Sequence, residues 1–333
     1  MPTISVCMPV FNGARFLPRT LYSLRDQGFR DFEVVVVDDG STDGSADEAE
    51  RLLALYDLTG RVIRTPNRGS ARARDTACVA ARAPIIATLD CDDWWAPDYL
   101  ADMLAVLHAH REIDLVYCDL LEEFPDGREI LKSDVAKWIE LPRVPCEGDV
   151  YRFTRGEFFA MLLCGQVLFP SCTMYTKTLY EHCGGYAATL PHLTTSLDWD
   201  FGLRASRLAT VAFLKRPLLR KYARADSVSH ASFIRTGTSS IRVLQAVLED
   251  STLRPEERRN ARRRGAVISA ACAYDFWATH KSSTQAMKWV FKSLRFKWNW
   301  SAVGIGIKAM IPRVWINRMR SGESGSSRMS GRR

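Results

Sequence analysis

The 333-residue chain lacks the hydrophobic segments that anchor a protein in a membrane or direct its export. Met1 leads directly into an apolar stretch without a basic region and a long apolar core, so we expect no signal peptide. The strongest candidate for a membrane span, residues 302–311, is about half as long as a bilayer requires and contains Lys308. We therefore expect no transmembrane helix and a cytoplasmic location.

Paired cysteines are missing as well. The nine cysteines are scattered, with no CxxC pair and no Cys/His spacing suited to zinc. An odd, scattered set is typical of reduced thiols in the cytoplasm. The composition, 47% hydrophobic and 25% charged, is that of an ordinary globular protein that is long enough for a large domain and an appendage.

The body of the chain has no net positive charge, and the net positive charge lies near the end of the sequence. Residues 254–333 hold 18 Lys and Arg against 4 Asp and Glu, a net charge of +14, whereas residues 1–253 carry a net charge of −6. The acidic body makes a poor nucleic-acid binder, so we expect no nucleic acid as partner. The basic part predicts an anionic surface as its partner, such as the inner face of the plasma membrane.

One segment of the basic part has the pattern of an amphipathic helix. Its apolar stripe is flanked by cations and by further aromatic side chains: the stripe is Met287, Val290, Phe291, Leu294 and Trp298, the cations are Lys288, Lys292 and Arg295, and the aromatics are Trp289, Phe296 and Trp300. Such a helix can lie on anionic lipid. It can equally pack on the rest of the protein or on another subunit, and the sequence leaves both open.

Short apolar runs rich in β-branched residues alternate with helical segments through the first 119 residues. The expected strands are Thr3–Met8, Phe32–Asp38, Arg61–Arg64, Ile85–Asp90 and Asp114–Asp119, and the expected helices are Arg15–Gln27, Ser45–Tyr56, Ser70–Ala83 and Tyr99–His110. This alternation predicts an α/β fold of βαβ units, with a mostly parallel sheet flanked by helices.

The pattern changes after residue 119. Residues 120–150 contain several prolines and glycines and predict a loop-rich insert. We expect 1–119 and 120–230 to be the two halves of one α/β domain, and 231–320 to be a helical basic extension. Residues 321–333 are rich in Gly, Ser and Arg and predict a disordered tail.

Polar residues collect where the expected strands end, which is where open parallel sheets bind their ligands. Pro9–Gly13 follow the first strand and Asp38–Asp43 follow the second. Asp38 and Asp39 can accept hydrogen bonds from a base N–H or from ribose hydroxyls, or they can belong to a simple Asx turn. Phe11 can stack on a nucleobase, or it can cover the edge of the sheet.

Three acids, Asp90, Asp92 and Asp93, follow the fourth expected strand within four residues. Crowded carboxylates repel one another unless a cation neutralises them, and oxygen ligands favour Mg²⁺ or Mn²⁺. The alternative is that Asp92 or Asp93 caps the helix that starts near Tyr99. These residues alone do not choose between a metal site and a cap.

The ordered set of motifs resembles the family 2 glycosyltransferases of GT-A fold, which transfer sugars from nucleotide sugars with inversion. The resemblance covers roughly residues 3–230, and its segments are Ser5–Asn12, Asp38–Ser45, Asn67–Asp75, Leu89–Pro97, Leu197–Arg204 and Arg224–Ser229. The third segment offers two arginines, Arg72 and Arg74, and the resemblance selects Arg74. Asp75 stands where the family usually has asparagine.

The resemblance implies a role for each matched position. It assigns contacts with the nucleotide sugar to Pro9, Phe11, Asp38, Asp39, Arg74, Asp90 and Arg224, and a divalent cation to Asp92 together with Asp90. The closing element often has a histidine where Arg224 stands. The catalytic base falls on Asp198, although Leu197 replaces the glutamate that usually precedes it. The alternative for Asp198 is the N-cap of the helix that it begins.

The activity that the resemblance implies is transfer of a sugar from a nucleotide diphosphate sugar, most often a UDP-sugar, with Mg²⁺ or Mn²⁺ as cofactor. The acceptor would be the hydroxyl of a saccharide or a lipid-linked acceptor in bacterial cell-surface polysaccharide or glycolipid synthesis, with the donor on residues 1–119 and the acceptor on 120–230. One alternative is a metal-dependent nucleotidyltransferase, which generally needs a basic phosphate loop that Pro9–Gly13 do not provide. Another is a non-catalytic nucleotide-binding protein.

Overall fold

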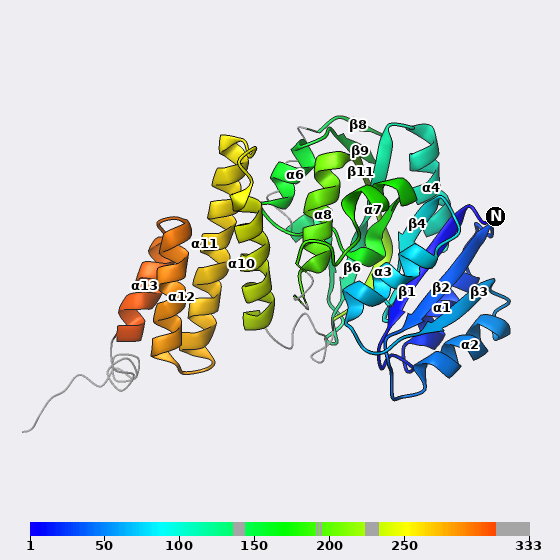
Figure 1. Cartoon of the computed structure of the whole chain (residues 1–333), viewed down its shortest axis with the longest axis horizontal. Coiled ribbons are helices and arrows are strands. Elements are labelled where there is room, and N and C mark those ends of the chain that lie inside the picture. The colour runs from blue at the N-terminus through cyan, green and yellow to red at the C-terminus, as the bar shows by residue number, and fades with distance from the viewer. Residues whose placement is uncertain (136–143, 191–192, 194, 224–232, 311–333) are drawn as a thin grey trace, which may run out of the picture. The chain divides into compact units, whose positions relative to one another are not determined.

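A computed structural model describes residues 1–135, 144–190, 193, 195–223 and 233–310. The chain divides into two compact units, Met1–Ala231 and Ser232–Arg333. The first unit has a central sheet flanked by helices, and the second is helical in its described part (Figure 1). The predicted α/β class is therefore confirmed for the first unit.

The sheet is mixed, and its strands run in the order β3-β2-β1-β4-β10-β6-β11-β9-β8, with β5 on β11 and β7 on β6. The strands are β1 Ile4–Val10, β2 Phe32–Asp38, β3 Gly60–Arg64, β4 Ile85–Thr88, β5 Asp93–Trp95, β6 Ile113–Glu123, β7 Glu129–Leu131, β8 Cys146–Glu147, β9 Val150–Phe153, β10 Thr173–Thr176 and β11 Thr210–Tyr222. The pairs β1–β2, β1–β4, β2–β3 and β6–β11 are parallel, and the other pairs are antiparallel.

Helices connect these strands and complete the second unit. In the first unit they are α1 Leu17–Arg25, α2 Ser45–Leu55, α3 Ser70–Ala80, α4 Tyr99–Ala109, α5 Lys132–Val135, α6 Glu157–Leu162, α7 Lys177–Cys183 and α8 Leu197–Leu208, with the 3-10 turn η2 at Pro170–Cys172. In the second unit they are α10 Phe233–Glu249, α11 Pro255–Ala278, α12 Ser283–Phe296 and α13 Trp300–Met310.

The apolar runs identified in the sequence form the buried centre of the sheet. Every residue of β1, β2 and β4 is buried. Strands that are covered on both faces need apolar side chains at every position rather than at alternate ones, which explains the run of four valines in β2. The carboxyl ends of β1, β2 and β4 therefore leave the core side by side, and their polar loops meet at one edge (Figure 1).

Strand β10 shapes this edge because it enters the sheet antiparallel, between β4 and β6. Met174 lies opposite Ala87 on β4, and Thr173 lies opposite Tyr117 on β6. The turn η2 comes directly before β10, so the antiparallel direction brings Ser171 beside the loop that follows β4. Trp95 fixes this arrangement, because its indole N–H donates to the Ser171 carbonyl at 2.6 Å.

The acids after β4 do not cap a helix. Asp93 begins the short strand β5, where it lies opposite Lys221 of β11. The next helix, α4, begins at Tyr99 with Asp98 at its N-cap position. The alternative that Asp92 or Asp93 starts this helix is therefore wrong, because backbone pairing with β11 continues the chain as a strand.

The second unit packs its helices closely. The ring of Phe296 lies over Gly265 of α11, where a Cβ atom would approach ring carbons to 2.5 Å. The Ser293 hydroxyl donates to the Ala266 carbonyl at 2.8 Å. None of the helices in the described part of the chain combines the length and apolar character that a bilayer crossing demands.

Candidate active site

The loops after β1 and β2 hold each other through side chains. The Asn12 N–H donates to the Ser41 hydroxyl at 2.9 Å, and the Thr42 N–H donates to the Asn12 side-chain oxygen at 2.9 Å. Asp43 accepts from the Ala14 N–H at 3.0 Å and from the Ser45 N–H at 3.1 Å. Asp43 therefore fixes these loops and the start of α2.

The two adjacent acids at the end of β2 have different environments. Both oxygens of Asp39 accept backbone N–H groups, from Arg68 at 2.8 Å and from Gly69 at 2.7 Å, so this carboxylate anchors the loop before α3. Asp38 accepts from the Ser41 N–H at 3.2 Å through Oδ2. Its buried Oδ1 has no hydrogen-bond partner among the described residues. Because an unsatisfied buried acceptor is costly, Asp38 has an oxygen suited to a ligand donor.

Two residues at the end of β1, Pro9 and Phe11, are predicted to contact the sugar donor. They lie at the edge of the sheet where β2 and β4 also end. Pro9 is a buried residue of β1, paired in register with Val37. Phe11 follows the strand, and its side chain is 50% exposed. The alternative that Phe11 is a core residue is therefore wrong, although the predicted stacking on a base stays a prediction.

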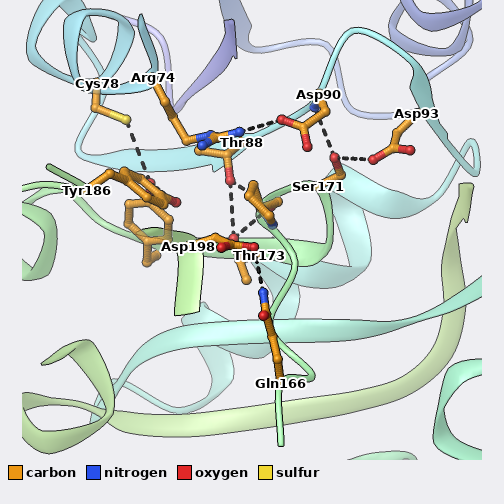
Figure 2. A network of polar contacts seen from close by, with 12 residues as sticks. Arg74, Cys78, Thr88, Asp90, Asp93, Gln166, Ser171, Thr173, Tyr186 and Asp198 are labelled. Carbon is orange, nitrogen blue, oxygen red and sulfur yellow. Dashed lines mark hydrogen bonds and ion pairs between the residues drawn. The ribbon is translucent and has the colours of Figure 1, made fainter. Parts of the chain in front are cut away.

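The structure separates the two arginines near the start of α3. Arg72 is exposed, whereas Arg74 is 5% exposed and donates to Asp90 Oδ1 at 2.5 Å. Its guanidinium also lies 5.0 Å from the centre of the Tyr186 ring. Burial lowers the pKa of Arg74, but the charge and hydrogen bond of Asp90, together with Tyr186 and Asp198, outweigh burial and raise the pKa above its usual value. Arg74 is therefore a fixed cation at this edge (Figure 2).

Protein groups already compensate two of the three acids after β4. Asp90 pairs with Arg74, and Asp93 accepts from the Ser171 hydroxyl at 2.6 Å opposite Lys221. Burial raises the pKa of Asp93, and the Lys221 charge opposes this effect. Charge repulsion therefore does not by itself require a metal, which corrects the argument made from the sequence.

A divalent cation nevertheless fits the oxygens that are present. Asp92 is half-buried, and Asp90 uses Oδ1 for Arg74 and retains Oδ2. Among the described residues, no group of three or more His, Cys, Asp or Glu side chains could hold a metal. Mg²⁺ commonly binds through one or two carboxylates and the phosphates of a substrate, so this site suits an ion that a diphosphate completes.

Asp198 lies on the other side of this edge, at the second position of α8. The N-cap position belongs to Ser196, and Asp198 Oδ2 instead accepts from the Gln166 amide at 2.5 Å. The alternative that Asp198 caps α8 is therefore wrong. Figure 2 shows Asp198 on the side of the network away from Asp90 and Asp93, with Gln166 beyond it.

The surroundings of Asp198 favour its protonated form. The residue lines a small cavity whose other walls include Leu168, Phe169 and Phe201. Burial raises the pKa of Asp198, and the Arg74 charge opposes this rise. A carboxyl group with a raised pKa is suited to accept a proton from a substrate. The adjacent Leu197 is buried, and Arg224 lies outside the described residues.

Sequence reasoning missed several residues that organise the site, and Asp75 is the clearest of them. Its carboxylate accepts from the Tyr180 hydroxyl at 2.8 Å, the Tyr186 N–H at 2.7 Å and the Ala187 N–H at 3.0 Å. The residue at position 185 must be glycine, because a Cβ atom there would lie only 2.7 Å from Asp75 Oδ1. The available signal was the aspartate at a position where the family usually has asparagine.

Comparison with known proteins identifies the family. The sequence model of glycosyl transferase family 2 matches residues 5–182. The chain belongs to this family. Its fold also resembles that of solved structures: the structure of Staphylococcus aureus TarS residues 1–349 in complex with UDP-GlcNAc superposes with a TM-score of 0.68 at 17% identity, over 97% of this chain and 92% of that one.

Curated relatives agree with the family assignment over part of their length. The putative glycosyltransferase EpsH of Bacillus subtilis is 38% identical over 136 residues, which cover 41% of this chain and 39% of EpsH. A PGL/p-HBAD biosynthesis glycosyltransferase of Mycobacterium bovis is 30% identical over 211 residues, which cover 61% of this chain and 69% of that protein. The match to the family 2 model spans the first four motif segments, which all lie before residue 182. The alignment with the Mycobacterium bovis protein is longer, at 211 residues.

The environment of Asp75 yields a first prediction. Asp75→Asn places an N–H₂ group where three donors converge, so at least one hydrogen bond is replaced by a donor–donor contact. We expect a loss of about 1–3 kcal/mol in the free energy of unfolding, measured by urea denaturation. Asp126→Asn, at an exposed aspartate, should change it by less than about 0.5 kcal/mol. Equal stability of Asp75→Asn and wild type would show that the acceptor-only character of Asp75 is unimportant.

Proposed function

We propose that the protein is an inverting glycosyltransferase that moves a sugar from a nucleotide diphosphate sugar to an acceptor hydroxyl. One observation carries the proposal: the Asp198 carboxyl group, with its raised pKa, lies within electrostatic reach of the Arg74–Asp90 pair. A proton acceptor and a phosphate-binding region are the two parts that a single displacement at an anomeric carbon needs. The family assignment weakens the alternatives of a nucleotidyltransferase and of a non-catalytic protein.

The donor would bind at the ends of β1, β2 and β4. Asp38 Oδ1 would accept from the base or ribose, and the exposed ring of Phe11 would stack on the base. Arg74 would offset negative charge near the diphosphate, and Arg224 would hold the diphosphate as the family resemblance implies. Pro9 and Asp39 would shape this surface. UDP is the proposed nucleotide, because the superposed TarS structure is described in complex with UDP-GlcNAc.

Asp92, with Asp90, would hold Mg²⁺ or Mn²⁺ against the donor. A solved mannosyltransferase from Pyrobaculum calidifontis, described in complex with GDP-Man and Mn²⁺, shares the fold with a TM-score of 0.58 at 19% identity. When bound, such an ion supplies Lewis-acid stabilisation of the diphosphate oxygens. Asp93 accepts from Ser171 and lies opposite Lys221, so the proposal places the ion on Asp92 and on the second oxygen of Asp90.

In the proposed reaction, the acceptor oxygen attacks the anomeric carbon from the face opposite the diphosphate. The bond between that carbon and the diphosphate oxygen breaks, and the electron pair leaves with the diphosphate. Asp198 takes the proton of the acceptor hydroxyl. Attack from the opposite face inverts the configuration at the anomeric carbon.

The acceptor is proposed to be a saccharide or lipid-linked molecule of bacterial polysaccharide or glycolipid synthesis. A similar Bacillus subtilis protein, 34% identical over 103 residues, is named a putative teichuronic acid biosynthesis glycosyltransferase. We propose that residues 120–230 form the acceptor side of the site, because Asp198 belongs to that half. We also propose a cytoplasmic location in which the basic C-terminal helices contact the membrane.

The proposed base predicts a specific pH dependence. Because burial raises the pKa of Asp198, the acid limb of kcat/KM should lie above the ordinary aspartate pKa of about 3.9, with activity lost as pH falls through the raised pKa. Asp198→Asn should lower kcat by about 10²–10⁴-fold and leave donor binding intact. Transfer of labelled sugar measures both effects, and near wild-type transfer by Asp198→Asn would contradict the assignment.

The proposed metal contact predicts a loss of metal-dependent donor binding. Asp92→Ala should remove most of the increase in UDP affinity that Mn²⁺ produces, as measured by isothermal titration calorimetry with and without the ion. Asp98→Ala is the matched control, because its exposed carboxylate lies just beyond β5 at the start of α4 and is 3.8 Å from Arg216. If Asp92→Ala binds UDP with the full Mn²⁺ effect, Asp92 does not contact the metal.

Exposure of side chains in the second unit indicates which residues of the basic part could contact a membrane. Val290 of the predicted stripe and the neighbouring Trp289 are buried, so packing within the protein accounts for them. Phe291, Trp298 and Trp300 are 59%, 62% and 75% exposed, and the nearby Lys288 and Arg295 are also exposed. Exposed aromatic side chains beside cations suit the interface of an anionic bilayer.

A vesicle assay tests this surface. The double variant Phe291→Glu with Trp298→Glu should reduce sedimentation with phosphatidylglycerol-containing vesicles by about tenfold or more, because it removes two apolar anchors and adds negative charge. Val79→Glu, at an exposed valine of α3, should sediment like wild type. Equal sedimentation of wild type and the double variant would exclude Phe291 and Trp298 from membrane contact.

A further inference from the structure

Gln166 makes a side-chain hydrogen bond to the proposed base, although no sequence motif includes it. It lies in the loop between α6 and η2, and its Nε2 donates to Asp198 Oδ2 at 2.5 Å and to the Leu168 carbonyl at 3.3 Å. The partners are a carboxylate and a carbonyl, and both can only accept when the carboxylate is ionised. The orientation of the Gln166 amide is therefore determined by its neighbours.

This contact acts on a carboxylate that also accepts from the Trp199 backbone N–H and whose adjacent cavity is lined by Thr173 and Tyr186. The charged groups that act on Asp198 are Arg74 from α3, whose charge favours ionisation, and Asp90 from the loop after β4, whose charge opposes it. Much of the remaining wall is apolar, with Leu168, Phe169 and Phe201 lining the adjacent cavity. In such surroundings neutral donors at hydrogen-bond distance stabilise the ionised carboxylate, and the Trp199 N–H and the Gln166 amide both act in this direction.

We propose that Gln166 is a positioning residue for the base: its amide fixes the Asp198 side chain in one orientation and stabilises the ionised, proton-accepting carboxylate. With Oδ2 fixed by Gln166, the direction of Oδ1 is fixed as well, and this is the oxygen that would receive the proton of the acceptor. The inference rests on the proposed role of Asp198 and deepens it.

The proposal predicts the direction in which the pKa of Asp198 changes when the Gln166 amide is removed. Gln166 donates to the charged form of Asp198, so loss of the amide raises the pKa of Asp198 further. A hydrogen bond to an ionised group corresponds to about one to two pKa units. At a fixed pH, less of the base is then ionised, so kcat falls and the acid limb of the pH profile moves upward. Gln166 forms hydrogen bonds with Asp198 and Leu168 and not with the proposed donor-binding residues. The KM for the donor should therefore be unchanged.

The variants separate positioning from packing. Gln166→Met keeps the length and volume of the side chain and removes the donor. Gln166→Glu keeps the shape and replaces the amide by a carboxylate, which repels ionised Asp198 near neutral pH. Gln245→Met, at an exposed glutamine of α10, is the matched control. Thermal unfolding verifies that each variant is folded, and Gln166→Glu carries the test if Gln166→Met does not fold.

The direct measurement is the ¹³C chemical shift of the Asp198 carboxyl carbon against pH, in full-length protein labelled with ¹³C-aspartate. The signal is assigned by its loss in Asp198→Asn, and no substrate is needed. We expect the pKa of Asp198 to rise by about one to two units in Gln166→Met, by at least as much in Gln166→Glu, and to be unchanged in Gln245→Met. An unchanged pKa in folded Gln166→Met would overturn the proposal.

Sugar transfer by the same proteins separates this inference from the proposed function. In support of both, Gln166→Met should show kcat reduced about tenfold or more at neutral pH, an unchanged donor KM, and recovery at higher pH. If the titration shifts but wild type transfers no sugar, the Gln166 contact stands and the proposed function fails. If wild type transfers sugar and the Asp198 pKa is the same in both proteins, only the role of Gln166 is wrong.

Discussion

The ion pair between the buried Arg74 and the partly exposed Asp90 connects the parts of the candidate site. Arg74 comes from α3 and Asp90 from the loop after β4, so one contact fixes the helix against the acidic loop. A buried guanidinium needs a partner, and removing one member of such a pair costs about 3–5 kcal/mol because the other charge is left uncompensated. The Tyr186 ring lies near the guanidinium, and Asp75 holds the backbone at Tyr186. Residues on both sides of Arg74 therefore restrict its position.

A second set of contacts orders the other end of the acidic loop. The Ser171 hydroxyl donates to Asp93 and accepts from the Asp90 N–H, at 2.6 Å and 3.0 Å. Lys221 lies opposite Asp93 across the β5–β11 pair, and its pKa is raised chiefly by the charge of Asp93. Arg74 and Lys221 thus offset negative charge of the acidic loop, which fits the proposal that a cation binds there together with a diphosphate rather than as a permanent metal centre.

The sequence predicted the parts of the fold that depend on local pattern. The predicted bounds of Phe32–Asp38 coincide with β2, and the helices starting at Ser45, Ser70 and Tyr99 begin as expected. Apolar period and turn residues are local signals, so they locate these elements. Because β1, β2 and β4 are parallel, their carboxyl ends lie at one edge of the sheet. This arrangement explains why Asp38, Arg74 and Asp90 come together there.

The contacts that the sequence did not reveal join residues far apart in the chain. Asp90 and Ser171 are separated by 81 residues, and Gln166 and Asp198 by 32. No periodicity encodes such pairs, because they depend on the antiparallel insertion of β10 between β4 and β6. The sequence also allows Asp93 to start a helix, because the strand β5 forms only by pairing with the distant strand β11. The family resemblance located Asp198 but not the residue that holds it.

In the proposed donor complex, Asp198 faces the anomeric carbon of a sugar whose diphosphate lies beside Asp92 and Arg74. A crystal structure of Asp198→Asn with an intact UDP-sugar and Mn²⁺ tests this geometry. We expect the diphosphate beside Asp92 and Arg74, and the anomeric carbon between that diphosphate and the side chain at position 198. A donor sugar that points away from position 198, or a nucleotide bound elsewhere on the protein, would contradict it.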